Sequence, residues 1–202
     1  MVKMLKEEIA PGIVIYSDVI PNSEKLCHDI EEGVISTKYQ WQAASVKENY
    51  ESAVNKKTRD TDSFSVPYKG YIETNLGETL ISAFLNSVNN IFFESFNPIE
   101  KDYMGGYGSI FKNHDDYTIL RYGVGQHFAN HIDDHPDYHR RVSTIYYIND
   151  DYIGGEIEFP RFNVTIKPKA NQMIIFPSTY VYNHSVKPVT EGTRYAVVSW
   201  IK

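Results

Sequence analysis

Four residues stand in an order that could hold a metal ion and a charged ligand beside it. His131 and Asp133 form a His-x-Asp pair, His184 follows from a distant segment, and Arg194 comes ten residues later. Two imidazoles and one carboxylate on one side of an Fe(II) ion form a facial triad, which leaves three coordination positions open. An arginine near such a centre would bind the carboxylate of a second ligand.

A strand is the element that lets the His-x-Asp pair act together. Residues i and i+2 of a strand point to the same face, whereas on a helix the same spacing separates them by about 200°. We therefore expect His131 and Asp133 on a strand, with His184 brought alongside from a second strand. An isolated His-x-Asp is usually a surface pair, so the metal-site hypothesis depends on the predicted strand and on the later His184 and Arg194. We assign no role to the remaining histidines: His28, His114, His127, His135 and His139.

Arg194 begins a predicted strand and would share one face with Ala196, Val198 and Trp200. If that face is inward, the guanidinium lies among apolar side chains and needs an anionic partner, because an unpaired buried charge is costly. The distal carboxylate of a dianionic ligand would serve. The alternative is a solvated arginine at the end of a strand.

The second half of the chain has the pattern of an all-β core. Short runs rich in β-branched and aromatic residues alternate with turn residues after about residue 105. The predicted strands are Tyr117–Tyr122, His127–Asp133, Val142–Ile148, Gly155–Phe159, Asn163–Lys167, Gln172–Phe176, Val181–Lys187 and Arg194–Ile201. Eight short antiparallel strands predict a jelly roll, in which two sheets enclose a pocket.

The first half is predicted to be mainly helical. Asn22 or Ser23 could cap a helix with apolar residues every four positions, namely Leu26, Ile30 and Val34. A second helix is expected from Asn75, with Glu78 completing a capping box, to an end marked by Pro98. The polar stretch Gln40–Lys69 predicts a short helix followed by an irregular strand near a substrate.

We therefore predict one α+β domain over residues 1–202. Residues 1–104 would supply mainly helical support and lid segments, and residues 105–202 the jelly-roll catalytic core. The candidate lid segments are Gln40–Lys69 and Asp134–Arg141.

Composition argues against several classes of partner. The net charge is −6 and no basic run is longer than Arg140-Arg141, which disfavours nucleic-acid binding. The sequence lacks a signal-peptide core and a run of about 20 apolar residues, so no membrane partner is expected. The single cysteine, Cys27, cannot form an internal disulfide, and we expect a reducing, cytoplasmic location.

From Tyr122 to its C-terminus the chain resembles the 2-oxoglutarate- and Fe(II)-dependent dioxygenases, specifically their prolyl 4-hydroxylase-like branch. The matching stretches are Arg121–Asp133, Thr144–Asn149, Gly154–Phe159 and His184–Trp200. They follow the family's order of motifs: a tyrosine, Gly-Gln, His-x-Asp, a tyrosine-rich strand, Gly-Gly, and a histidine with Lys or Arg ten residues later. The resemblance implies a double-stranded β-helix, which is the jelly-roll core of this family.

The resemblance also implies cofactors and roles. His131, Asp133 and His184 would bind Fe(II), and Arg194 would pair with the distal carboxylate of the co-substrate 2-oxoglutarate. Tyr122 would hydrogen-bond this co-substrate and Tyr147 would line its pocket, while O2 is the second co-substrate and ascorbate a further candidate cofactor. Two other aromatic residues are expected to pack only, Tyr146 in the sheet and Trp200 in the pocket wall.

The implied reaction is hydroxylation of an unactivated C–H bond with release of succinate and CO2, on a prolyl residue of a protein or peptide. A small-molecule hydroxylase acting on a free amino acid is the alternative, and a non-enzymatic metal-binding jelly roll is the third. Many family members acting on collagen-like chains carry lysine at the position of Arg194. Either cation can bind the carboxylate, so this position does not identify the substrate. The sequence does not identify the oligomeric state either.

Overall fold

The computed structural model describes residues 5–38, 40–48, 51–68, 80–105, 113–135 and 139–202. Its helices are α1 (Leu26–Thr37) and α3 (Leu80–Met104), with short 3-10 helices at Ser23–Lys25, Pro160–Phe162 and Tyr180–Tyr182. Its strands are β1 (Leu5–Ala10), β2 (Ile13–Ser17), β3 (Gln42–Ala43), β4 (Val46–Glu48), β5 (Glu51–Ala53), β6 (Arg59–Asp60), β7 (Asp62–Val66), β8 (Tyr117–Tyr122), β9 (His127–His131), β10 (Val142–Tyr147), β11 (Ile153–Gly154), β12 (Ile157–Phe159), β13 (Val164–Ile166), β14 (Gln172–Pro177), β15 (His184–Val186), β16 (Val189–Glu191) and β17 (Arg194–Ile201).

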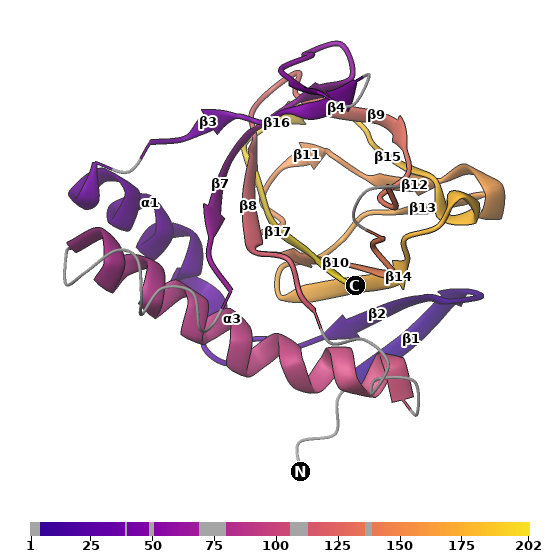
Figure 1. Ribbon diagram of the computed structural model, residues 1–202, viewed down its shortest axis with the longest axis horizontal. Coiled ribbons are helices and arrows are strands. Elements are labelled where there is room, and N and C mark those ends of the chain that lie inside the picture. Colours follow the sequence, from indigo (N-terminus) through magenta and orange to yellow (C-terminus); the bar gives the residue numbers. More distant parts are fainter. Residues whose placement is uncertain (1–4, 39, 49–50, 69–79, 106–112, 136–138) are drawn as a thin grey trace.

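Two antiparallel sheets form the framework (Figure 1). The larger has eight strands in the order β1-β2-β14-β10-β17-β8-β7-β3, and the smaller has five in the order β13-β12-β15-β9-β6. Two short ladders, β11-β16 and β4-β5, complete the described strands. This architecture confirms the predicted α+β jelly roll with supporting N-terminal helices.

Alternation of side chains gives the larger sheet two apolar faces. On β10, Val142 and Tyr146 belong to a core cluster on the helix side, whereas Ile145 and Tyr147 belong to the cluster between the sheets. Each face buries apolar surface, so the sheet can be covered by helices on one side and by the smaller sheet on the other. Tyr146 therefore packs in the core, as expected.

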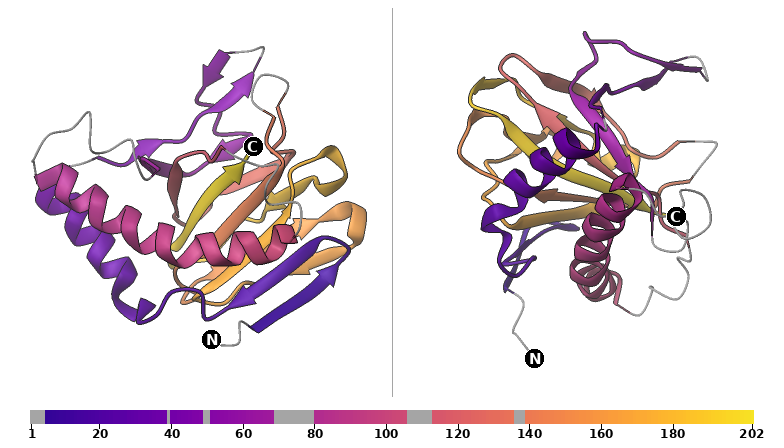
Figure 2. Two further views of the ribbon diagram at one scale, coloured as in Figure 1. Left: turned by 60° about the horizontal axis from the view of Figure 1, so that its bottom comes forward. Right: turned by 90° about the vertical axis from the view of Figure 1, so that its left-hand side faces the viewer.

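The two helices lie against the outer face of the larger sheet (Figure 2). The predicted stripe of α1 is confirmed, since Leu26, Ile30 and Val34 are its buried residues. The helices approach closely at Gly33, where a Cβ would overlap the Phe84 ring of α3. Glycine at this position is thus required by helix–helix contact.

Three helix predictions need correction or fall outside the description. Asn22 has a φ of 54° and no side-chain capping bond, and α1 begins three residues after Ser23. The predicted end at Pro98 is wrong, because α3 continues to Met104. Burial of flanking apolar side chains outweighs the hydrogen bond that proline removes. The predicted start at Asn75 and Glu78 lies outside the described residues.

The first half is also less helical than predicted. β1 and β2 form a hairpin that joins the larger sheet through β14, while β7 pairs with β8 and β6 with β9. The described part of Gln40–Lys69 contains strands and no helix. The strands β6 and β7 are short and find their partners, β9 and β8, far along the chain, so their own sequences carry little pattern.

The second half follows the prediction closely. β8 and β17 have the predicted bounds, β14 extends one residue past its predicted end to Pro177, and the other predicted strands recur with trimmed ends. Two differences matter: β9 ends at His131 rather than Asp133, and residues 180–182 form a 3-10 helix instead of the start of β15.

Replacing Gly33 with alanine should destabilise the protein. Alanine normally favours a helix over glycine, but the new methyl group would collide with Phe84. Overpacking of this kind costs about 1–3 kcal/mol, which thermal denaturation would show as a lower Tm. Ile35→Ala is the control, because Ile35 is exposed on the same helix and should change Tm little. A Gly33→Ala protein as stable as wild type would contradict the close contact.

Candidate metal centre

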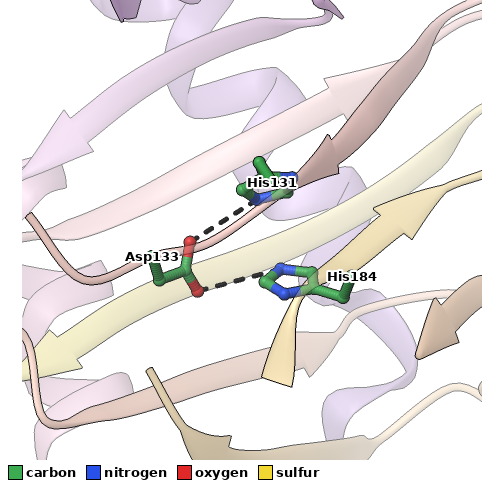
Figure 3. A group of neighbouring side chains, drawn as sticks. All are labelled: His131, Asp133 and His184. Atoms are coloured by element: carbon green, nitrogen blue, oxygen red, sulfur yellow. Dashed lines mark ion pairs between the residues drawn. The ribbon is translucent and has the colours of Figure 1, made fainter. Parts of the chain in front are cut away.

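Two strands of the smaller sheet bring the predicted triad together. His131 is the last residue of β9 and pairs directly with His184, the first residue of β15. Asp133 completes the group from a bend just beyond β9 (Figure 3). Its carboxylate oxygens lie 3.5 Å from His131 Nε2 and 3.8 Å from His184 Nε2. The three possible ligand atoms lie within 4.8 Å of one another.

The route to this convergence differs from the prediction. Asp133 was expected on the strand, where alternation would turn it to the side of His131. The bend after β9 performs that task instead, and leaves Ile132 between them 46% exposed. Among the described residues, the triad is the one group of three metal-binding side chains close enough to share an ion.

Backbone carbonyls orient both imidazoles. His131 Nδ1 lies 2.9 Å from the Ala129 carbonyl oxygen, and His184 Nδ1 lies 3.1 Å from that of Tyr182. A carbonyl only accepts, so each Nδ1 carries the proton and donates. With the proton on Nδ1, each Nε2 keeps a lone pair that a metal ion can bind.

Ser143, which the sequence analysis did not select, orients the carboxylate. Its hydroxyl donates to Asp133 Oδ2 at 2.7 Å and lies 2.8 Å from the hydroxyl of Ser178. Both serines are buried. Ser143 is two residues from Ile145 on β10, so its inward direction could have been found from strand alternation.

Burial sets the protonation states of the triad. It lowers the pKa of His184 to about 4, and the nearby His131 adds to this effect. Burial would by itself raise the pKa of Asp133, but the two imidazoles and the Ser143 hydrogen bond hold that pKa below its ordinary value. At neutral pH, His184 is a neutral ligand and Asp133 an anionic one, a donor set that suits Fe(II).

Aromatic rings enclose the imidazoles. Phe128 stacks on His131 with ring centroids 3.5 Å apart, and Phe176 meets His184 edge-on at 4.8 Å. Apolar walls of this kind keep water from the ligands and strengthen electrostatic interactions within the site.

The triad opens into a cavity of about 710 Å³ between the sheets. Its walls come from the larger sheet, the smaller sheet and both predicted lid segments. Lining residues include Ser45, Arg59, Tyr122, Asp134, His135, Arg140, Arg194 and Trp200. Trp200 thus contributes to the wall, as expected, and the Arg140 guanidinium lies 3.4 Å from its ring centroid.

Arg194 is buried in the cavity wall at 1% exposure. Its guanidinium carbon lies 4.7 Å from the Tyr122 ring centroid and 5.0 Å from that of Tyr147. Within the described part of the chain, Arg194 Nε and Nη1 have no hydrogen-bond partner. The alternative of a solvated strand end is therefore wrong. A buried charge with free donors fits a carboxylate ligand.

The tyrosines around Arg194 are placed differently. Tyr122 lines the cavity, whereas Tyr147 stands behind Arg194 and is not among the lining residues. Burial raises the pKa of the Tyr147 phenol, so it stays protonated. Tyr152, which the sequence analysis did not select, is also buried. Gly155 packs closely against Tyr152 and Arg194, since a Cβ at this glycine would lie 3.0 Å from both the Tyr152 ring and Arg194 Cδ.

The unassigned histidines stay outside the triad. His127 Nε2 lies 3.2 Å from the Lys57 carbonyl oxygen, and His28 pairs with Glu32 on the helix surface. His114 is the unexpected one: its side chain is 7% exposed and its Nε2 lies 3.1 Å from Glu100, a partner that no local spacing indicates.

Comparison with known proteins identifies the family to which this chain belongs. A family model described as the 2OG-Fe(II) oxygenase superfamily matches residues 102–202, half of the chain. The chain belongs to the 2OG-Fe(II) oxygenase superfamily. Fe(II), 2-oxoglutarate and O2 are accordingly the cofactor and co-substrates of its family, and both the triad and the unpaired Arg194 donors fit them.

A PKHD-type hydroxylase of Prochlorococcus marinus is 39% identical over 85 residues, which is 39% of this chain and 38% of that protein. The match thus spans well under half of that relative. Solved structures cover more but share less sequence, and show the fold alone. A Pseudomonas putida prolyl-4-hydroxylase has a TM-score of 0.71 at 16% identity, covering 95% of this chain and 92% of its own.

A prolyl hydroxylase from Trichoplax adhaerens, in complex with a hypoxia inducible factor peptide fragment, has a TM-score of 0.65 at 19% identity. The likeness covers 94% of this chain and 83% of that one. No helix in the described ranges is both long and apolar enough to cross a membrane.

Metal binding should depend on Asp133. We expect Fe(II), added anaerobically, or Mn²⁺ to raise Tm of the wild-type protein, since a ligand at a hundredfold excess over Kd stabilises by about 2.7 kcal/mol, roughly 5–10 °C here. Asp133→Ala should remove this shift, while Asp134→Ala, one carboxylate along the chain, should keep it. An equal shift in the Asp133→Ala protein would place the ion elsewhere.

Proposed function

We propose that this protein is an Fe(II)- and 2-oxoglutarate-dependent dioxygenase that hydroxylates a prolyl residue in a protein or peptide. The observation that carries the proposal is the convergence of a His-Asp-His triad and an unpaired buried arginine on one cavity. We further propose that residues 1–202 act as one domain, because strands from both halves share the two sheets.

In this proposal His131, Asp133 and His184 bind Fe(II) through atoms already turned toward one another. Iron and 2-oxoglutarate, when bound, supply the oxidation that hydroxylates the substrate and releases succinate and CO2. Ser143 keeps one carboxylate oxygen of Asp133 in place by its hydrogen bond. The enclosing rings Phe128 and Phe176 limit water around the imidazoles.

Arg194 has the role of binding the distal carboxylate of 2-oxoglutarate. Its Nε and Nη1 donors would gain partners, so the ligand offsets the cost of the buried charge. Tyr122 lies beside the guanidinium in the cavity wall and would contact the same ligand. Tyr147, behind Arg194, would orient the guanidinium from the opposite side.

A peptide substrate is supported by the segments around the cavity. Ser45 and Val46 line it from the first predicted lid, and Asp134 and His135 from the second. In this proposal, an extended chain contacts these segments while its prolyl residue enters the cavity. The Trichoplax prolyl hydroxylase of similar fold is seen with a peptide, which agrees with this choice.

The reaction type can be tested without knowing the substrate. Protein loaded with Fe(II) and 2-oxoglutarate should form succinate slowly in air, and His131→Ala should abolish this by removing a metal ligand. Succinate is measured by chromatography or coupled assay. Absence of succinate, together with a preference for Zn²⁺, would instead indicate a non-enzymatic metal-binding jelly roll.

Arg194 should chiefly affect the co-substrate. Arg194→Ala should raise KM for 2-oxoglutarate roughly 10- to 100-fold, the loss expected for hydrogen bonds to a charged group. Arg194→Lys should recover part of this, because the charge remains. Arg141→Ala, an exposed arginine outside this cavity, is the control. An unchanged KM in Arg194→Ala would refute the carboxylate role.

The substrate class follows from mass spectrometry. We expect proline-containing peptides incubated with the loaded protein to gain one oxygen atom, with fragmentation locating it on proline. Oxygen gained only by free amino acids would favour the small-molecule alternative.

A further inference from the structure

Arg59 is a cation in the wall of the metal-centre cavity, and it has no carboxylate partner among the described residues. It lies on β6, directly opposite Phe128 in the antiparallel pairing with β9. Its Nη1 donates to the Ser45 carbonyl oxygen at 3.2 Å. In the part of the chain that the structure describes, its buried Nε has no hydrogen-bond partner, and no Asp or Glu lies within ion-pair distance of its guanidinium.

The guanidinium is close to the centre of the site. Its carbon lies 4.7 Å from the Phe128 ring centroid, and Phe128 in turn stacks on His131 at 3.5 Å with the rings 13° from parallel. One aromatic ring therefore separates the charge of Arg59 from a triad residue. A group bound by Arg59 would belong to a molecule that also reaches the metal centre.

Unlike Arg59, the other two arginines of the cavity have an anionic partner or an anionic ligand assigned to them. Arg140 is paired, with its Nε 3.2 Å from Asp115 Oδ2. Arg194 has its ligand in the distal carboxylate of 2-oxoglutarate under the proposed function. Arg59 is the third, and its positive charge is not balanced by the described residues. A half-buried unpaired guanidinium favours an anion, and its fork of donors matches a carboxylate.

We propose that Arg59 binds a carboxylate of the molecule that is hydroxylated, so that the enzyme selects substrates with an acidic group near the reacting carbon. This inference rests on the proposed function. The carboxylate could be an acidic side chain next to proline in a peptide, or the α-carboxylate of a free amino acid. A neutral carbonyl would satisfy the Nε donor but leave the charge uncompensated.

The test uses substrate pairs that differ only in this charge. Peptides with Glu or Gln, and with Asp or Asn, on either side of proline separate the side-chain source, and L-proline with L-prolinamide tests the α-carboxylate. The readout is stimulation of succinate release over the uncoupled rate. We expect the acid of at least one pair to stimulate roughly tenfold better than its amide, chiefly through KM.

Variants then assign the preference to Arg59. Arg59→Gln should remove the preference for the acid over its amide, and Arg59→Lys should retain part of this preference. Arg59→Glu should instead favour a peptide in which lysine replaces the acidic residue beside proline. Lys57→Gln, which removes a charge from an exposed residue of the same segment, should leave the preference for the acid intact. Each Arg59 variant should still form succinate without substrate, so that acid and amide are compared within one folded, iron-loaded protein.

Two outcomes would overturn the proposal: equal responses to acid and amide in every pair, or a preference that survives in Arg59→Gln. Both leave uncoupled succinate formation by the wild-type protein in place, and with it the proposed function. Failure of the proposed function is seen separately, as absence of any succinate from the iron-loaded wild type, and would overturn the role of Arg59 as well.

Discussion

The antiparallel pairing of β9 with β15 is the constraint on which the site depends. It sets His131 opposite His184 across one ladder, so that two residues far apart in the sequence share one face. A shift of one residue in this pairing would turn one imidazole to the other side of the sheet. The bend that follows β9 adds Asp133, and Ser143 from the opposite sheet holds the carboxylate toward both rings.

The larger sheet supplies the rigid wall against which this geometry is held. Its outer face is covered by α1 and α3, and its inner face carries Arg194 and Tyr122 directly opposite each other on neighbouring strands. A buried guanidinium without its full set of acceptors lowers the stability of the ligand-free protein. This loss of stability occurs at a site where an anionic ligand would reverse it, as is common for binding sites.

Much of the fold could be predicted because local pattern and long-range packing agree in the second half. β8 and β17 alternate between the two core clusters, and their bounds follow directly from that alternation. The first half lacks this agreement. The strands β6 and β7 are short, and they form because β9 and β8 offer edges to pair with. Pro98 lies within α3 for a related reason, since packing on the sheet overrides a local signal to stop.

The sequence by itself determined the donor set, because residue type decides which atoms can bind a metal or a carboxylate. It also determined that Arg194 shares one face of its strand with Ala196 and Val198, whereas the packing of the two sheets decided that this face is buried. Only the tertiary structure decided how Asp133 reaches the centre, that Ser143 orients it, and that Arg59 faces the same cavity without a counter-ion among the described residues. These depend on bends, strand order and the neighbours that each charge meets, which are properties of contacts between distant segments and leave no local pattern.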